Sequence, residues 1–232
     1  FVLPYEPSIV EHFGIPGFVG SGICIKDPPP MRIPGRGRSM IPNPYYFKKD
    51  RLEHYVTRIR QYYCATLSEL VLQVKKNRES LVKRAVARLN LFYDVVLIDE
   101  FQDFREYDYE LIMALAKQFN DVVLVGDYHQ HSVSAINNSG KPFKKRASDV
   151  GYDEFVAELQ SAGFEVDTTT LDKSRRCSTE VCEFVSRKLG INISSCGENA
   201  GSVIWTDANA AEILENQQIV KLVFKDAASY SF

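Results

Sequence analysis

The sequence Asp94-Val95-Val96-Leu97-Ile98-Asp99 is a run of β-branched and aliphatic residues that ends in an acidic residue. A second run of the same character follows at 121–127, Asp-Val-Val-Leu-Val-Gly-Asp. Between them, residues 106–119 place Leu111, Ile112, Leu115 and Phe119 on one helical face. Continuous apolar strands separated by one helix are typical of a parallel sheet covered on both faces. The stretch therefore predicts a βαβ unit and an α/β fold.

The sequence before this unit divides into two regions. Residues 1–44 hold nine of the ten prolines, which predicts an irregular, loop-rich region without long helices. From about Lys48 to Leu89 there is neither proline nor glycine, and an apolar stripe at helical spacing predicts a helical stretch. The stripe consists of Leu67, Leu70, Val71 and Val74.

The α/β pattern continues beyond residue 150. We expect helices at about 152–162 and 179–189, and strands at about 166–171 and 202–206. Gly163 and Gly190 stand where helix C-termini need a left-handed residue.

Composition narrows the class of protein. With 45% hydrophobic and 25% charged residues, the 232-residue chain resembles an ordinary soluble globular protein. A formal net charge of −2 gives no global attraction to nucleic acid, so any such site must be a local patch. The five cysteines are scattered without a CxxC pair, which indicates reduced thiols and a cytoplasmic protein. No apolar run approaches the ~20 residues that span a bilayer, so no membrane partner is expected.

Acidic residues follow both predicted strands of the βαβ unit. In an open parallel sheet, ligands bind beyond the carboxyl ends of the strands, where Asp99, Glu100 and Asp127 fall. Mg²⁺ prefers hard oxygen ligands, so one carboxylate beside phosphates suffices, and Glu100 is then free to polarise a water. The alternative is that these acidic residues only form loops or cap helices. This alternative applies most strongly to Asp127. Asp99 and Glu100 share their loop with Gln102 and Asp103, a crowding that solvation alone does not explain.

Three motifs carry a family resemblance. Leu97-Ile98-Asp99-Glu100-Phe101-Gln102-Asp103 resembles the Walker B motif of UvrD/Rep-like superfamily 1 helicases, hydrophobic residues followed by D-E-x-Q-D. Residues 123–130, Val-Leu-Val-Gly-Asp-Tyr-His-Gln, are similar to the third motif of that family, V-G-D-x-x-Q. Residues 171–177, Leu-Asp-Lys-Ser-Arg-Arg-Cys, resemble the fourth, L-x-x-N-Y-R-S. The motifs occur in the order of the family and span about 85–190.

The resemblance implies a fold and an activity. The fold would be a partial RecA-like P-loop NTPase sheet, with an accessory or insertion region at 1–90. Residues 91–165 would be part of the first motor domain, and 166–232 the start of the second. The activity would be that of an ATP-dependent DNA helicase or translocase, with ATP and Mg²⁺ as cofactors and single-stranded or partly duplex DNA as partner. Protein partners in repair or phage defence would fit such a motor.

The resemblance also assigns roles to residues of the acidic loop. By it, Asp99 would hold Mg²⁺ and Glu100 would be the catalytic base for the attacking water. Gln102 and Asp103 would connect the state of the nucleotide to neighbouring motifs, and Asp127 would contribute to nucleotide binding.

Two further residues would act on the γ-phosphate. Gln130 would sense it, and Arg176 would serve as an arginine finger, a group whose loss can slow such reactions ~10³-fold or more. The alternative for Arg176 is a surface charge at a helix N-terminus. The chain departs from the fourth motif at Ser174 and Arg175, which replace asparagine and tyrosine, and His131 begins a run that lacks the aromatic of the third motif.

The phosphate-binding loop of such motors is absent from the 232 residues. No GxxxxGK[ST] run occurs, and Asn138-Ser139-Gly140-Lys141 is followed by Pro142, which has no hydroxyl for Mg²⁺. The chain also lacks an initiator methionine. The resemblance implies that the loop lies upstream and the fifth and sixth motifs downstream, so we expect an internal fragment that is inactive alone.

A basic and aromatic region is the candidate for nucleic acid. From Arg32 to Arg60 there are eight basic residues against two acidic ones, interleaved with Tyr45, Tyr46, Phe47 and Tyr55. Cations beside aromatic faces suit single-strand binding. The residues we assign to it are Arg36, Arg38, Tyr45, Tyr46 and Lys48. The alternative is a solvated helix face with core aromatics.

Two other functions remain open. A metal-dependent nuclease could use Asp99, Glu100 and Asp103. The resemblances at residues 123–130 and 171–177 to the third and fourth helicase motifs would then be unexplained. A degenerate motor could bind DNA or protein without catalysis.

Overall fold

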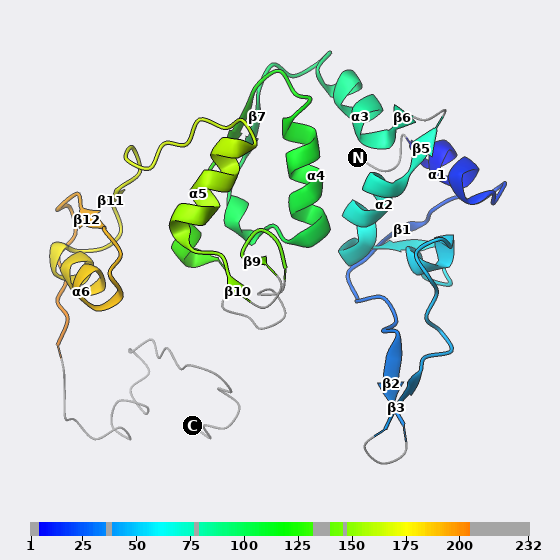
Figure 1. Ribbon diagram of the computed structural model, residues 1–232, viewed down its shortest axis with the longest axis horizontal. Coiled ribbons are helices and arrows are strands. Elements are labelled where there is room, and N and C mark those ends of the chain that lie inside the picture. Colours follow the sequence, from blue (N-terminus) through cyan, green and yellow to red (C-terminus); the bar gives the residue numbers. More distant parts are fainter. Residues whose placement is uncertain (1–4, 36–38, 77–78, 132–139, 146–147, 205–232) are drawn as a thin grey trace. The chain divides into compact units, whose positions relative to one another are not determined.

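The computed structural model describes residues 5–35, 39–76, 79–131, 140–145 and 148–204. Its contacts divide the chain into two units, Phe1–Phe164 and Glu165–Phe232. Helices and short sheets, both parallel and antiparallel, alternate along the chain, so the predicted mixed α/β class is confirmed (Figure 1). The assignment of the two units to two motor domains stays a prediction.

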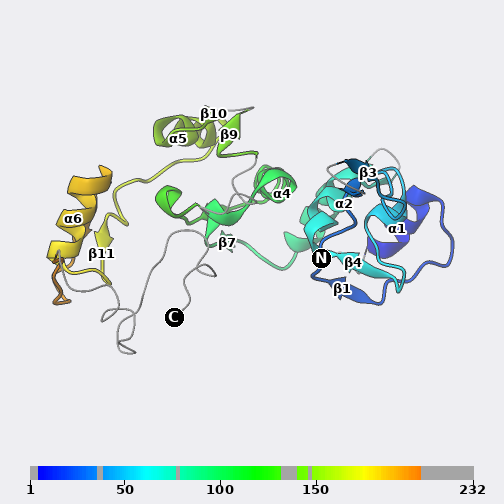
Figure 2. The same ribbon diagram turned by 90° about the horizontal axis from the view of Figure 1, so that it is seen from below.

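The proline-rich region is loop-rich, as predicted, with one short helix among its described residues. Helix α1, Glu6–Phe13, has proline in its first turn and ends at Gly14, whose φ of 65° glycine adopts without a steric cost. Strand β1, Gly22–Cys24, pairs in parallel with β4, Gln61–Tyr63 (Figure 2). Strands β2, Arg32–Pro34, and β3, Met40–Pro42, form an antiparallel hairpin.

The prediction of a helical stretch over 48–89 is wrong for its first part. Arg60 has a φ of 64°, which a right-handed helix cannot contain, and Tyr62 buries its ring from strand β4 instead. The hairpin of β5, Lys75–Lys76, and β6, Glu79–Ser80, then separates two helices, and Ser80 caps the second by accepting from Lys83 N at 3.2 Å. The helices are η2 (Leu52–His54), η3 (Cys64–Thr66), α2 (Leu67–Gln73) and α3 (Leu81–Leu89).

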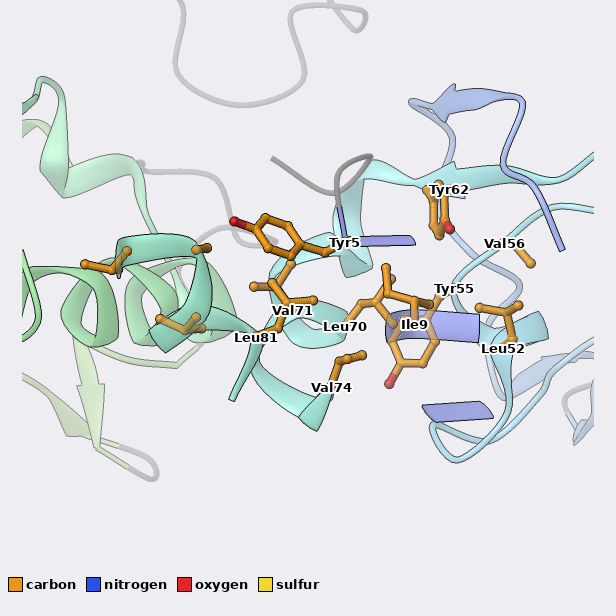
Figure 3. Packing of buried hydrophobic residues seen from close by; sticks show 13 residues of the cluster. Tyr5, Ile9, Leu52, Tyr55, Val56, Tyr62, Leu70, Val71, Val74 and Leu81 are labelled. Carbon is orange, nitrogen blue, oxygen red and sulfur yellow. The ribbon is translucent and has the colours of Figure 1, made fainter. Parts of the chain in front are cut away.

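A buried apolar cluster joins α1, α2 and α3 to residues 52–62 (Figure 3). The predicted stripe of α2 is confirmed, since Leu70, Val71 and Val74 are almost fully buried. Helix α4, Glu106–Ala116, and the residues after it add partly buried side chains to this cluster, among them Leu111 and Phe119. The core therefore connects the N-terminal helices to the predicted βαβ unit.

The βαβ unit is confirmed. Strand β7, Val96–Ile98, pairs in parallel with β8, Val122–Leu124, and α4 connects them. Coverage on both faces is wrong for the described part of the chain. Successive side chains of a strand point to opposite faces, and Leu97 is 74% exposed while its neighbours in β7 are half-buried. One face of this sheet is therefore open there.

Within the unit, the short helix η4 (Phe101–Asp103) lies between β7 and α4. The elements that follow the unit are η5 (Tyr128–Gln130), the hairpin β9 (Lys144–Lys145) with β10 (Ser148–Asp149), and α5 (Tyr152–Ser161). Helix α5 agrees with the helix expected at 152–162, and Gly163 beyond it has a φ of 99°.

The second unit contains α6, Thr179–Leu189, as expected, with Ser178 as its N-cap and Gly190 in the left-handed conformation. Strand β11, Lys173–Ser174, pairs in parallel with β12, Ser194–Ser195. The strand expected at 166–171 is wrong: Asp167 Oδ1 accepts from the backbone of Thr169 and Thr170 and bends the chain into a turn. Residues 202–204 form no strand, and 205–206 lie outside the described residues.

Across the part of the chain described above, no helix combines the length and apolar character needed to cross a membrane.

Candidate functional site

The loops after β7 and β8 lie side by side. Beyond the paired residues, Val125 N donates to Ile98 O at 2.8 Å and Phe101 N donates to Val125 O at 2.9 Å. These bonds extend the ladder past both strand ends. The predicted acidic loop, 99–103, is therefore held against Gly126 and Asp127, as expected for the carboxyl edge of a parallel sheet.

The two acids that follow β7 are exposed. Glu100 has a φ of 51° and a ψ of 41°, a left-handed conformation that is uncommon outside glycine, and its N–H donates to Asp99 Oδ1 at 2.8 Å. Sparsely populated backbone conformations of this kind occur often at functional sites. The conformation leaves both carboxylates accessible at the end of the strand.

Gln102 joins the two loops. Its side chain is almost fully buried; Nε2 donates to Glu100 Oε2 at 2.5 Å, and Oε1 accepts from Asp127 N at 3.0 Å. A Cβ added to Gly126 would lie 2.6 Å from Gln102 Oε1 and 3.2 Å from Phe101 N. Gly126 is therefore needed for this close approach. Strand and helix periodicity does not point to Gly126, although its place in the V-G-D-x-x-Q motif is a signal for it.

Asp127 caps the short helix η5. Its Oδ1 accepts from His129 N at 2.9 Å, and its Oδ2 accepts from Gln130 Nε2 at 2.7 Å. The capping role that was left open for Asp127 is therefore present in the structure. The carboxylate also fixes the amide of Gln130, so the structure brings both predicted residues into one loop beside Gln102.

Arg105 holds the C-terminal end of the acidic loop in place, a role that the sequence did not indicate. Its guanidinium donates to the carbonyl oxygens of Gln102 and Phe104, and lies 4.1 Å from the ring centroid of Phe143. Burial lowers the pKa of Arg105, and the charge of Asp103 opposes that shift. Asp103 itself is exposed. The loop is thus anchored at Gln102 and Arg105 while its acids face solvent.

The donor set at this edge suits a magnesium ion that is held together with phosphates. Within the described ranges, no group of three or more His, Cys, Asp or Glu side chains could hold a metal ion. Asp99, Glu100 and Asp103 therefore do not form a three-carboxylate centre. Mg²⁺ bound beside phosphates keeps several waters and needs only one or two protein carboxylates. The exposed Asp99 and Glu100 can provide such carboxylates.

The nucleic-acid candidates lie in different environments. Arg36 and Arg38 lie outside the described residues. Tyr45 is 56% exposed, with the guanidinium of Arg58 4.8 Å from its ring centroid, and Lys48 is exposed. Tyr46 is half-buried against the edge of His54.

Tyr55, which the sequence placed among the interleaved aromatics, is fully buried. Its hydroxyl donates to Gln73 Oε1 at 2.7 Å. The core-aromatic alternative is therefore correct for Tyr55, while Tyr45 keeps an accessible ring.

Arg176 lies in the second unit, three residues before α6, and is exposed. Its N–H donates to Ser174 Oγ at 3.2 Å, and its carbonyl oxygen accepts from Asn199 Nδ2 at 3.1 Å. The turn that carries Arg176 is thus fixed through its backbone, while the position just ahead of a helix N-terminus agrees with either proposed role.

A comparison with protein families identifies the central part of the chain. The family model of the UvrD/REP helicase N-terminal domain matches residues 43–132. No curated protein matches the chain. The matched range contains both strands of the βαβ unit, the acidic loop and the loop of Asp127. Residues 43–132 of the chain are therefore UvrD/Rep-like helicase sequence that matches the N-terminal domain of that family.

Proposed function

We propose that the chain is part of a motor that couples ATP hydrolysis to movement along single-stranded DNA. The observation that carries this proposal is the bridged pair of loops, in which Gln102 joins Glu100 to the backbone of Asp127. The match of residues 43–132 to a helicase family supports it. The cytoplasm is the proposed location, and protein partners in repair or phage defence belong to the same proposal.

Asp99 and Glu100 would take different parts in hydrolysis. When bound, Mg²⁺ and ATP supply the phosphoryl group and neutralise charge on its oxygens. Asp99 is the carboxylate that would hold the ion. Glu100, whose Oε2 is oriented by Gln102 Nε2, would accept the proton of the attacking water.

The neighbouring residues would position this pair. Gln102 and Asp103 would carry changes in the acidic loop to the loop of Asp127. The Asp127 carboxylate holds Gln130, whose amide would turn toward the γ-phosphate. Arg176 would stabilise the charge that develops on the transferred group.

The proposed DNA contacts combine Tyr45 and Lys48, which are exposed, with Tyr46, Arg36 and Arg38. A base stacked on an aromatic ring contributes ~1–3 kcal/mol. Since Arg58 lies over one face of Tyr45, a base would stack on the other.

A second candidate is a degenerate motor that binds DNA without hydrolysis, and the lack of a GxxxxGK[ST] run in the 232 residues favours it. The two candidates are separated by measuring ATP hydrolysis with and without single-stranded DNA in a protein that contains this segment behind a phosphate-binding loop. We expect DNA to stimulate hydrolysis, and Asp99→Asn to raise the Mg²⁺ concentration needed for half-maximal rate. DNA binding without any hydrolysis would favour the degenerate motor and contradict the proposal.

A further inference from the structure

The carboxylate of Glu69 in α2 is a buried charge that the proposed reaction does not use. Its side chain is 8% exposed, and it forms an ion pair with Lys49 Nζ and lies 3.5 Å from His54 Nε2. A carboxylate removed from water needs charged or hydrogen-bonding partners. Glu69 therefore ties the segment that follows the candidate DNA-binding residues to α2.

The backbone of this segment is fixed as well. The carbonyl oxygen of Lys49 accepts from Gln73 Nε2 at 3.0 Å and lies 3.0 Å from the hydroxyl oxygen of Tyr55. The imidazole of His54 lies 2.7 Å from Phe47 O through Nδ1. Lys49 directly follows Lys48, and its contacts hold the C-terminal end of the Tyr45–Lys48 segment. A bound strand that restricts the motion of Tyr45–Lys48 would therefore also restrict Lys49.

The same lysine reaches α4. Lys49 Nζ donates to the hydroxyl of Tyr107 at 2.8 Å and lies 4.8 Å from the centroid of its ring. One residue on, Asp108 Oδ1 accepts from Ser68 Oγ of α2 at 2.5 Å. Tyr107 and Asp108 lie in the first turn of α4, which follows the acidic loop after Arg105 (Figure 1). A continuous set of contacts therefore connects the Tyr45–Lys48 segment to the loop that carries Asp99 and Glu100.

We propose that Lys49, held between Glu69 and Tyr107, couples strand binding at Tyr45 and Lys48 to the first turn of α4, and through it to the acidic loop. The proposal rests on the proposed DNA contacts and adds how they would regulate the nucleotide site. A strand that orders Tyr45–Lys48 lowers the freedom of Lys49, and the hydrogen bond to Tyr107 extends that ordering to α4. Coupling of this kind is reciprocal, so ordering of α4 would also favour strand binding.

The test measures hydrogen exchange of the Asp108 and Tyr109 amides, which both donate to Arg105 O, in the 232-residue chain. Exchange is compared with and without a single-stranded oligothymidylate, whose affinity is measured in parallel. In the wild type we expect the oligonucleotide to slow exchange at these amides about fivefold or more. Tyr107→Phe, which loses the hydroxyl but leaves the Lys49–Glu69 pair, should still bind the oligonucleotide, at most about fivefold more weakly, without slowing exchange.

Tyr152→Phe is the matched control, because Tyr152 also begins a helix and is exposed to the same degree as Tyr107. It should behave as the wild type. Slowed exchange that persists in Tyr107→Phe overturns the coupling role and leaves the DNA contacts standing. A wild type that binds without any slowing does the same. A wild type that does not bind the oligonucleotide overturns the DNA contacts and the coupling together.

Discussion

The backbone of Gly126 lies against Gln102 in the candidate site, with no room for a side chain. Substitution of this glycine tests whether the close packing matters. Gly126→Ala places a methyl group 2.6 Å from Gln102 Oε1. We expect the free energy of unfolding to fall by about 1–3 kcal/mol, because overpacking forces the bridging amide and backbone apart. Chemical denaturation measures it. Gly151→Ala, where an added Cβ meets nothing within 4 Å, should cost less, roughly 0.5 kcal/mol, which arises from its N-cap position before α5. Equal effects of the two would contradict the close-packed bridge.

Gln102→Glu tests the bridge itself. The new carboxylate can neither donate to Glu100 Oε2 nor avoid its charge, and it remains buried. We expect the free energy of unfolding to fall by roughly 1–3 kcal/mol near neutral pH. Thermal denaturation measures this loss. The loss should shrink at acidic pH, where protonation of either carboxylate restores a donor. A variant as stable as the wild type at neutral pH would remove Gln102 from its assigned role.

The acidic residues could be predicted from the sequence, whereas the bridge between them could not. Asp99 and Glu100 follow a run whose apolar character marks a strand end, and a D-E-x-Q-D pattern includes Gln102. The bond from Asp127 N to Gln102 Oε1 depends on the left-handed conformation of Glu100 and on the lack of a Cβ at Gly126. Neither feature follows from strand and helix periodicity.

At the scale of elements, α2 depends on its buried carboxylate. Glu69→Ala leaves Lys49 and His54 without their common partner and opens space in a packed region. We expect the free energy of unfolding to fall by about 2 kcal/mol, less than for a fully buried pair because Lys49 is half exposed. Glu53→Ala removes an exposed pair with Arg51 and should cost less than about 0.5 kcal/mol. Denaturation curves in which both variants lose equally would contradict this ranking.

Elements with strong periodicity could be predicted, and those decided by single residues could not. The α2 stripe, α4 and α6 follow from apolar spacing and from the glycine cap at Gly190, whereas the Ser178 N-cap of α6 came from the structure. The break of the helix predicted at 48–89 depends on Arg60, whose positive φ has no signal in composition. A strand was predicted at 166–171, but the side chain of Asp167 forms a local turn there instead. Apolar content does not show that such a turn replaces a strand.

For the whole molecule, buried tyrosines make stability depend on alkaline pH. Burial raises the pKa of Tyr62, and its hydrogen bond to Glu6 adds to the shift. The folded chain keeps this proton at a pH where the unfolded chain loses it, so stability is full below about pH 10 and falls above it. The fall is at most about 1.4 kcal/mol per pH unit for each such group. Unfolding measured from pH 8 to 11 should show a shallower fall in Tyr62→Phe, and an unchanged slope would contradict the assignment.

The 232-residue chain by itself should not turn over ATP. It contains Asp99 and Glu100 but no GxxxxGK[ST] run to hold the phosphates, and catalysis of phosphoryl transfer depends mainly on such positioning. A phosphate-release assay with Mg²⁺, ATP and single-stranded DNA should give the rate of the buffer alone. Hydrolysis at the rate of an ordinary motor would show that the chain holds the phosphates by other residues.

We propose that Glu100, at the end of β7, activates water for attack on ATP. The most direct measurement is steady-state ATP hydrolysis and nucleotide affinity for Glu100→Gln, in a protein that joins this segment to a phosphate-binding loop. We predict that turnover falls by about 10²-fold or more while ATP still binds, since the amide cannot accept the proton. Glu110→Gln, which alters a surface pair with Lys141, should keep the wild-type rate. Wild-type turnover in Glu100→Gln would contradict the account.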